Sequence, residues 1–486
     1  MQALEIIQLE GPPLGMDLNL KKNELVFFSD CPDHFPAECT RFRNNFDLLG
    51  SPIGDEKYCT STISAFIQKR VQHSLDALGS VNDAQVSHYL FRLCTSICKV
   101  VHLLRTVPPI FCREALSRFD CAIQSAFSVA MGVVFPPDAW EQMSLPILRG
   151  GFGLRRATLH ASAAYLASVC NAGKLDKWAA LQAIGYADAV RDLQSHVGEP
   201  VNICPENPPT QRSLSALVDQ KCLQELLIRC QPLDQARIHA IGAPGASSWL
   251  GVIPSPSLNQ SFSSLQYTTL LKWWLGMSVY TTHAACPACG VLSDRLGYHA
   301  LTCTSGGGLG VRHNALREVF LHFCKLAHLP ALREAPALLA DSACRPADVL
   351  ILPCLPSSID RPTCLDFAVT HTQQPNHINR ASVCVAAAEQ YERKVKFPMY
   401  KERCDEAKLN FIPMVVDCFG AWGPSSNDAF KILAKAAANR KNVPEDYAHL
   451  SVRRSMSVVL QRYNVRTLLA LAPPELDLDD GTPNFV

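Results

Sequence analysis

Apolar residues follow a helical period over a long stretch in the first half of the chain. Between residues 61 and 186 they recur three or four positions apart, as at Ile63 and Phe66, which is the spacing of one helix face. Residues 12–60 contain short apolar runs separated by turn residues, and they predict short strands and turns. Residues 187–282 are again predicted to be helical. The first part of the chain is therefore expected to be mostly α-helical.

The pattern changes in the last third of the chain, where helical and strand-like segments alternate. Residues 314–327 predict an amphipathic helix, and the apolar runs 348–352, 364–370 and 411–418 predict strands. A further helix is predicted over residues 383–397. A helix followed by two strands, a helix and a strand predicts an α/β core. The expected fold class is therefore α/β together with α.

Composition indicates a folded chain of several domains. The 486 residues are 48% hydrophobic and 18% charged, enough for about two to four domains with their own cores. The net charge of +1 excludes a protein that coats nucleic acid through bulk positive charge, but it leaves room for local basic faces. The 21 cysteines are an odd number without framework spacing, so mostly reduced thiols are expected.

The chain is expected to act inside the cell, in the nucleus or the cytoplasm. Its first ten residues are too short and too acidic for a signal peptide. No run of 18 apolar residues is present, so neither secretion nor a membrane span is predicted.

A compact group of cysteine and histidine residues predicts a metal site. Cys286 and Cys289 are separated by two residues, and His299 and Cys303 follow closely. Three thiolates and one imidazole form a closed tetrahedral set for structural zinc. The alternative is that four residues of common types fall close together by chance.

Two features flank this motif. Trp273 and Trp274 precede it and are expected to pack against it. The glycine run 306–308 follows it, but no Gly-Lys-Ser/Thr sequence comes next. A flexible hinge is therefore predicted there, and not a phosphate-binding loop.

Acidic residues in the apolar strands suggest a second metal site. Asp348 and Asp366 open or interrupt predicted strands, where a charge is costly unless it is paired or bound to metal. Neighbouring strands could bring both to one Mg²⁺ or Mn²⁺, with Glu334 as a third acid. Lys396, or less favourably Lys394, could stabilise charge on a phosphate. The alternative is that the acids are turn residues and the lysines a solvated face.

The lysine is expected to reach these acids from one helix face. Glu389, Arg393, Lys396 and Tyr400 are spaced so that they share a face. Pro398 is expected to interrupt the helix near its end, which would leave Tyr400 just beyond it.

Several of these motifs together resemble a known family. The segments 345–350, 365–370 and 415–423, with Lys396 and Tyr400 between them, are similar to the restriction-like endonuclease at the C-terminus of site-specific non-LTR retrotransposons. In that family a CCHC zinc knuckle immediately precedes the nuclease, as it does here.

The resemblance implies a PD-(D/E)xK fold that nicks DNA with a divalent metal. The family's metal-binding acids correspond to Asp348 and Asp366, and its displaced catalytic lysine corresponds to Lys396. Ala347, Ala368 and Met399 depart from the commonest or generic form of the motifs, although the family itself moves the lysine away from the position of Ala368.

The N-terminal part resembles the end of the reverse transcriptase of the same elements. Residues 18–24 and 46–54 are similar to its last palm motifs, and residues 145–154 to the segment after its thumb. Polymerisation needs paired metal-binding aspartates, and the only Asp-Asp pair is Asp479-Asp480 in the acidic tail. No polymerase activity is expected, and the chain is interpreted as a truncated or domesticated retrotransposon product.

The resemblance and the element pattern predict six segments. They are a palm remnant (1–60), a thumb-like helical region (61–186), a helical linker (187–282), the zinc knuckle (283–304), the nuclease (305–440), and a C-terminal helix with an acidic tail (441–486).

Two hypotheses from different classes follow. The first is a Mg²⁺- or Mn²⁺-dependent DNA endonuclease with structural Zn²⁺, whose partners are a DNA target and, as a further candidate, the element's RNA. The second is a catalytically silent nucleic-acid-binding protein, which Ala347 and Met399 favour. Basic residues that could contact phosphate, or simply form solvated faces, are Arg345, Arg393, Lys394, Lys396, Lys401, Arg403, Arg453, Arg454, Arg462 and Arg466.

Overall fold

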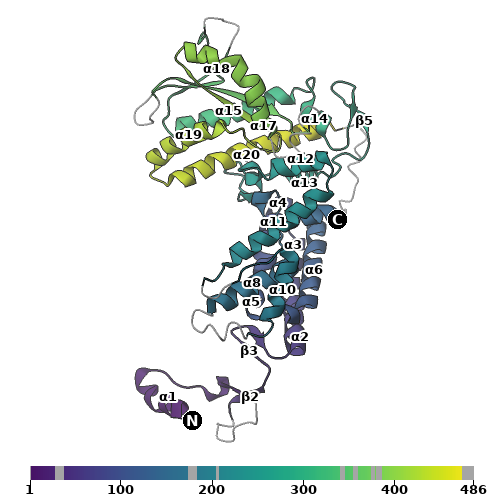
Figure 1. Ribbon diagram of the computed structural model, residues 1–486, viewed down its shortest axis with the longest axis vertical. Helices are drawn as coiled ribbons and strands as arrows, with labels where there is room; N and C mark the ends of the chain where they lie inside the picture. The colour runs from purple at the N-terminus through teal and green to yellow at the C-terminus, as the bar shows by residue number, and fades with distance from the viewer. Residues whose placement is uncertain are drawn as a thin grey trace. The chain divides into compact units, whose positions relative to one another are not determined.

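The computed structural model is a mixed α/β structure in which helices predominate over small sheets (Figure 1). It describes residues 2–27, 38–172, 183–203, 207–339, 345–353, 360–373, 378 and 386–472. The acidic tail from residue 473 lies outside the described residues. The coarse fold class expected from the sequence is confirmed.

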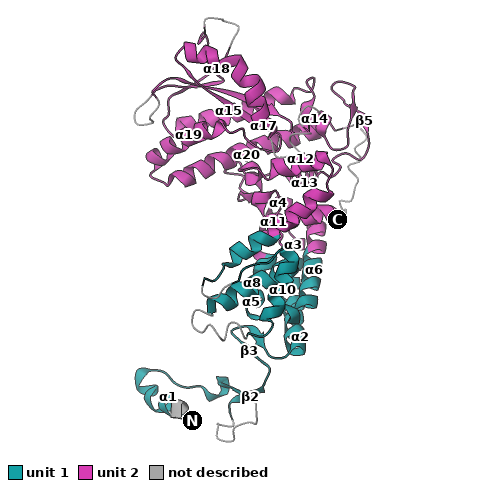
Figure 2. Cartoon of the chain, viewed as in Figure 1, with its two compact units in different colours: residues 1–76, 95–123, 156–218 teal, residues 77–94, 124–155, 219–486 magenta. Residues whose placement is uncertain are grey.

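The chain divides into two compact units (Figure 2). Unit 1 contains residues 1–76, 95–123 and 156–218, and unit 2 contains residues 77–94, 124–155 and 219–486. This division does not test the six segments expected from the sequence, which remain predictions. Among the described helices, none is both long and apolar enough to cross a membrane.

Unit 1 is built around helix α8 (Ala157–Ala172), whose residues are buried on nearly all sides. Asp120 sits at the N-terminus of α8 and accepts hydrogen bonds from the backbone N–H groups of Ala157 (2.7 Å) and Thr158 (3.1 Å), because those groups have no partner within the helix. Two small pairs of strands, β1 (Glu24–Phe27) with β2 (Thr40–Arg43) and β3 (Phe46–Leu48) with β4 (Ser51–Ile53), lie between α1 (Gln2–Glu10) and α2 (Glu56–Phe66) in the sequence.

The principal elements that lie wholly in unit 1 are α1 (Gln2–Glu10), β1 (Glu24–Phe27), β2 (Thr40–Arg43), β3 (Phe46–Leu48), β4 (Ser51–Ile53), α2 (Glu56–Phe66), α5 (Val101–Thr106), α8 (Ala157–Ala172) and α10 (Tyr186–Val197). Helices α3 (Gln72–Gly79), α6 (Arg113–Met131) and α11 (Gln211–Arg229) each contain a boundary between the units in the sequence.

The helical part of unit 2 contains the tryptophan pair. Its helices are α4 (Ala84–Leu90), α7 (Pro137–Ser144), α12 (Pro232–Ile241) and α13 (Ser264–Trp274). Trp273 stacks on Phe419 with ring centroids 4.3 Å apart, and the Trp274 indole N–H donates to the carbonyl of Gly150 at 2.9 Å. These contacts replace the packing that was expected against the zinc motif.

The remainder of unit 2 is a four-stranded sheet covered by helices. The strand order is β10-β9-β8-β7, with β10 parallel to β9 and the other neighbours antiparallel. The strands are β7 (Ala331–Arg333), β8 (Val349–Ile351), β9 (Thr363–Thr370) and β10 (Asn410–Asp417). The last three confirm the predicted strands, whereas the short edge strand β7 was not predicted.

Alternation of side chains along the strands separates two apolar layers. Val349, Leu365 and Met414 face a large core formed with α15 (Gly308–Leu326), α19 (Ser426–Lys441) and α20 (Glu445–Ala470). Leu350 and Cys364 face the opposite way, toward α18 (Phe397–Glu406). Figure 1 shows α18 on one side of the sheet and α15, α19 and α20 on the other.

The glycine run after the zinc motif begins a helix and does not form the expected hinge. Gly307 is the N-cap of α15 with a φ of +69°, and Gly308 is the first helical residue. A methyl group on Gly308 would lie 2.6 Å from the Thr467 hydroxyl on α20. Glycine therefore permits close packing of α15 against α20, and the predicted helix start at residue 314 was too late.

The helix that carries Lys396 continues through Pro398. It consists of α17 (Ala387–Tyr391), a π-helical turn over Glu392–Lys396, and α18. Pro398 lies in the first turn of α18, directly after the π-helical turn. The expected interruption is therefore wrong, and Tyr400 lies inside the helix. Residues 383–385, where the sequence predicted its start, lie outside the described residues.

A buried glutamate packs against the loop that follows β10. Glu392 is 1% exposed and accepts a hydrogen bond from the Ser425 hydroxyl at 3.0 Å. Burial raises the pKa of Glu392 to about 7. A Cβ atom on Gly423 would lie 1.9 Å from Glu392 Oε1, so only glycine leaves room for this carboxyl group.

We expect Gly423→Ala to lower the free energy of unfolding by about 1–3 kcal/mol, because the added methyl group overpacks a buried site. Gly310→Ala is the matched control, since its methyl group would meet no atom within 4 Å and alanine favours the helix by up to about 1 kcal/mol. Chemical denaturation measures both. Equal stability of the Gly423→Ala and Gly310→Ala proteins would contradict this account.

Candidate metal centre and nuclease site

A short hairpin presents the first two cysteines of the zinc motif. Strands β5 (Ala284–Ala285) and β6 (Leu292–Ser293) pair antiparallel. The turn between them is closed by hydrogen bonds from Cys286 N–H to the Val291 carbonyl and from Gly290 N–H to the Cys286 carbonyl, both 2.8 Å. Gly290 has a φ of +75°, a conformation that glycine adopts without strain.

A one-turn helix presents the other two ligands. Helix α14 (Tyr298–Thr302) carries His299, and Cys303 follows it directly. The Asp294 carboxylate accepts hydrogen bonds from the N–H groups of Tyr298 at 3.0 Å and His299 at 2.6 Å. These bonds stabilise the start of the helix and so orient the histidine.

The four side chains converge on one point. Their ligand atoms all lie within 4.8 Å of one another, with Cys289 Sγ 3.2 Å from His299 Nε2 and Cys286 Sγ 4.0 Å from Cys303 Sγ. The ligand atoms of a tetrahedral zinc site are roughly 3.5–3.8 Å apart, given its bond lengths. Among the described residues, this is the one group of at least three such side chains found so close together. The group can hold a metal such as zinc.

One of the thiols, that of Cys286, ionises more readily than a free cysteine. Burial raises the pKa of the Cys286 thiol, but hydrogen bonds from the backbone N–H groups of Ala288 and Cys289 and from His299 more than offset this effect. The pKa of Cys286 therefore lies below its ordinary value. The thiolate is the form that binds metal.

Residues 280–303, which contain the β5–β6 hairpin and α14 and are called the metal module below, are hydrogen-bonded to helices α15 and α20. The buried Arg312 of α15 donates to the Leu301 carbonyl in α14 at 3.2 Å and to Asn464 Oδ1 in α20 at 2.7 Å. The Tyr280 hydroxyl donates to the Leu468 carbonyl at 2.7 Å. Loss of a metal bound at these four side chains would therefore disturb contacts with the core of unit 2.

The two aspartates lie opposite each other, Asp366 within β9 and Asp348 directly before β8. The antiparallel register pairs Val349 with Leu365, so its extension by one residue places Asp348 opposite Asp366. Asp348 Oδ2 accepts a hydrogen bond from the Phe367 N–H at 2.7 Å. Both carboxylates belong to the strand positions that alternate away from the large core.

Lys396 lies directly on this pair. Its Nζ is 2.5 Å from Asp366 Oδ2, and the two side chains are only 12% and 9% exposed. Burial raises the pKa of Asp366 above its ordinary value, although the charge of Lys396 works in the opposite direction. The Lys396 ammonium group also lies 5.9 Å from the ring centres of Tyr391 and Tyr400. The structure thus brings together the two acids and the lysine named from the sequence.

A histidine that the sequence reasoning missed completes the group. His313 Nε2 on α15 lies 3.3 Å from Asp348 Oδ1. Burial raises the pKa of Asp348, but the hydrogen bond and charge of His313 outweigh this effect, so the pKa lies below its ordinary value. The available signal was weak: His313 precedes the apolar stripe Leu316 and Phe320 by one helical turn.

Two other predicted residues lie at the margin of the site. The Glu334 carboxylate is bound by Arg317, while its backbone N–H donates to the Asp348 carbonyl at 2.9 Å. The Glu334 side chain is therefore engaged elsewhere, although its backbone adjoins the acids. Lys394 is exposed, and among the described ion pairs it is Lys396 that meets Asp366.

The predicted phosphate-binding residues differ in their surroundings. Arg345, Arg393, Lys401 and Arg403 are exposed, although Arg393 forms an ion pair with Glu389 at 2.6 Å. Arg453, by contrast, is buried and donates to the Pro244 carbonyl at 2.9 Å. Arg453 therefore has protein partners, and the expectation that it contacts phosphate stays a prediction.

The sequence matches no family model and no curated protein. The resemblance to retrotransposon endonucleases therefore rests on the motifs of the chain itself. The spatial grouping of Asp348, Asp366 and Lys396 is a separate observation, because spacing in the sequence does not guarantee it.

We expect Cys289→Ser to release about one equivalent of zinc, because a hydroxyl group replaces one of four ligands. The variant should also unfold at a lower temperature, since a closed metal site contributes to folding. Cys94→Ser, which changes an exposed cysteine outside the motif, is the control. Elemental analysis and thermal unfolding of both variants provide the measurement; an unchanged zinc content in Cys289→Ser would refute the assignment.

Proposed function

We propose that the protein is a metal-dependent DNA endonuclease derived from a non-LTR retrotransposon, with a zinc knuckle beside a restriction-like nuclease core. The observation that carries the proposal is the buried ion pair of Lys396 and Asp366 beside Asp348. A lysine next to two strand-borne acids is the constellation that the sequence resemblance anticipates. The implied cellular site is the nucleus, where the DNA target lies.

The carboxylates would hold the catalytic ion. Asp348 and Asp366 supply oxygen ligands of the kind that Mg²⁺ and Mn²⁺ prefer, and the register of β8 and β9 fixes them on one face of the sheet. When bound, a divalent ion would polarise the scissile phosphate and lower the pKa of a bound water. Asp366 would be deprotonated on binding, so its raised pKa makes ion binding weaker in acid.

Lys396 and His313 would support these acids in different ways. Lys396 supplies a positive charge from a largely buried position, where an electrostatic interaction with a phosphate oxygen is stronger than in water. The tyrosine rings beside Lys396 hold its ammonium group in place. His313 binds one oxygen of Asp348 and thereby orients that carboxylate.

We expect Asp348→Ala and Asp366→Ala to abolish nicking of supercoiled plasmid DNA in Mg²⁺, because each removes a ligand. Lys396→Ala should slow nicking by roughly 100- to 1,000-fold, the usual effect of losing one electrostatic donor. Lys394→Ala is the matched control, since it removes a neighbouring but exposed lysine, and it should nick at nearly the wild-type rate. Gel analysis of relaxed plasmid over time measures all four.

DNA affinity measured on the same proteins separates the two functional classes. Binding should persist in all four variants, because most affinity comes from phosphate contacts made elsewhere. Nicking by Asp348→Ala at the wild-type rate would exclude the nuclease site. Binding without nicking in the wild-type protein would instead identify a catalytically silent nucleic-acid-binding protein.

A further inference from the structure

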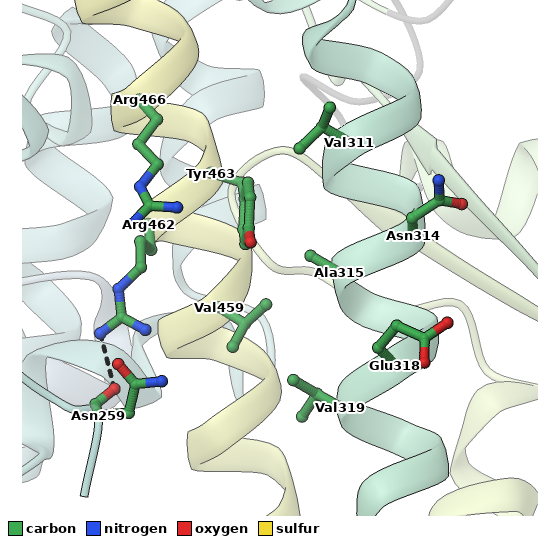
Figure 3. A pocket seen from close by; sticks show the side chains of 10 residues that line it. All are labelled: Asn259, Val311, Asn314, Ala315, Glu318, Val319, Val459, Arg462, Tyr463 and Arg466. Atoms are coloured by element: carbon green, nitrogen blue, oxygen red, sulfur yellow. Dashed lines mark hydrogen bonds between the residues drawn. The ribbon is translucent and has the colours of Figure 1, made fainter. Parts of the chain in front are cut away.

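A groove lies between helices α15 and α20 in unit 2. It has a volume of about 460 Å³, within the roughly 300–1,000 Å³ range of small-molecule sites. Figure 3 shows α20 forming one wall and α15 the other. The lining residues are Asn259, Val311, Asn314, Ala315, Glu318, Val319, Val459, Arg462, Tyr463 and Arg466.

Two guanidinium groups lie along the α20 wall. Arg462 donates to the Asn259 carbonyl at 2.6 Å and to the Ser261 carbonyl at 3.2 Å, and it lies over the Phe262 ring. Arg466 is exposed and lies 5.2 Å from the centre of the Tyr463 ring. Figure 3 shows both arginines on the same side of α20.

These positive charges are not neutralised by a carboxylate. Within the described part of the chain, neither Arg462 nor Arg466 forms an ion pair. Burial lowers the pKa of Arg462, and the charge of Arg466 lowers it further. An anion at this wall would relieve that repulsion.

Glu318, the acid on the α15 wall, already accepts hydrogen bonds from other residues. Glu318 Oε1 accepts hydrogen bonds from Arg317 at 2.9 Å and from Arg333 at 3.2 Å. The two arginines offset its charge, so Glu318 does not oppose an anion strongly. The net charge of this part of the groove favours a negatively charged ligand.

An aromatic ring stands between the two walls, and an amide lies at the rim of the α15 wall. Tyr463 faces α15 in Figure 3, and Asn314 projects from α15. Tyr463 is half-buried and Asn314 is exposed. A tyrosine ring beside a cation can stack a nucleobase, and an amide can bond its edge. Val311, Val319 and Val459 supply apolar surface around them.

We propose that this groove binds an unpaired nucleic-acid strand, with one base stacked on Tyr463 and the adjoining phosphate bound by Arg466. Arg462 contributes a second, fixed positive charge. This inference rests on the proposed function, because a nuclease acting on DNA meets such strands, but it concerns a surface distinct from the nicking site.

A single strand fits the groove better than a duplex does. The bases of a duplex are stacked on each other and cannot reach a ring set between two helices. An unpaired base can leave its neighbours and stack on an aromatic side chain. DNA and RNA strands share the base and phosphate chemistry that the groove recognises, so binding experiments must compare them.

The test is fluorescence anisotropy of the full chain with labelled oligothymidylate and oligouridylate of about 15 nucleotides, in buffer without Mg²⁺. Tyr463→Ala should weaken binding of at least one strand by roughly 5- to 100-fold, whereas Tyr463→Phe should retain it because the stacking ring remains. Arg466→Gln should reduce the slope of log affinity against log salt by about 0.7, the effect of one lost phosphate contact. Lys441→Gln, on the exposed end of α19, is the control and should leave both unchanged.

The outcomes distinguish the groove from the nuclease site. Weaker binding of oligothymidylate, of oligouridylate or of both in Tyr463→Ala supports the groove and identifies the strand. Unchanged binding of both strands in Tyr463→Ala and Arg466→Gln would overturn the proposal, provided that thermal unfolding shows folded variants. Asp348→Ala should bind like the wild type, so a failure of nicking leaves this result unaffected.

Discussion

A buried amide on α20 joins the parts of unit 2 that carry chemistry. Asn464 donates to the Cys418 carbonyl after β10 at 2.7 Å and accepts a hydrogen bond from Arg312 of α15. Arg312 in turn bonds the helix of the metal module. Since a buried polar group is costly without partners, these groups specify one arrangement of sheet, metal module and helices. An apolar core of the same volume would not impose that arrangement.

The loop after β10 is held by a second buried polar residue. The Asp417 carboxylate accepts hydrogen bonds from the N–H groups of Gly420 at 2.8 Å and Ala421 at 2.9 Å. Burial raises the pKa of Asp417 to about 6. The Asp417 carboxylate therefore closes the turn after β10. This structural role accounts for an aspartate in the segment 415–423 without metal binding. The tryptophan pair of α13 packs on the same loop through Phe419.

The candidate catalytic group depends on irregular backbone. The π-helical turn at Glu392–Lys396 inserts an extra residue in the helical register, and Lys396 emerges from it to meet Asp366. Such turns are frequent at functional sites. The same turn points Glu392 into the protein, where Gly423 leaves space for its carboxyl group. The same π-helical turn therefore positions both the buried Glu392 and Lys396.

The sequence by itself determined the strands and the candidate metal site, because each is specified by a pattern of residues close together in the chain. Apolar runs identified strands β8, β9 and β10, because alternation and continuous burial are properties of the strand itself. The spacing of Cys286, Cys289, His299 and Cys303 identified the candidate metal site, because a short loop must bring these side chains together. The acids and Lys396 were named from motif order.

Only the tertiary structure decided how the acids and Lys396 meet. Strand register sets Asp348 opposite Asp366, and helix packing brings His313 to Asp348. Likewise, contacts between distant segments decided that the glycines begin α15, that Trp273 packs on Phe419, and that Arg453 is buried. Such contacts depend on which surfaces meet in space, and no local pattern of residues encodes them.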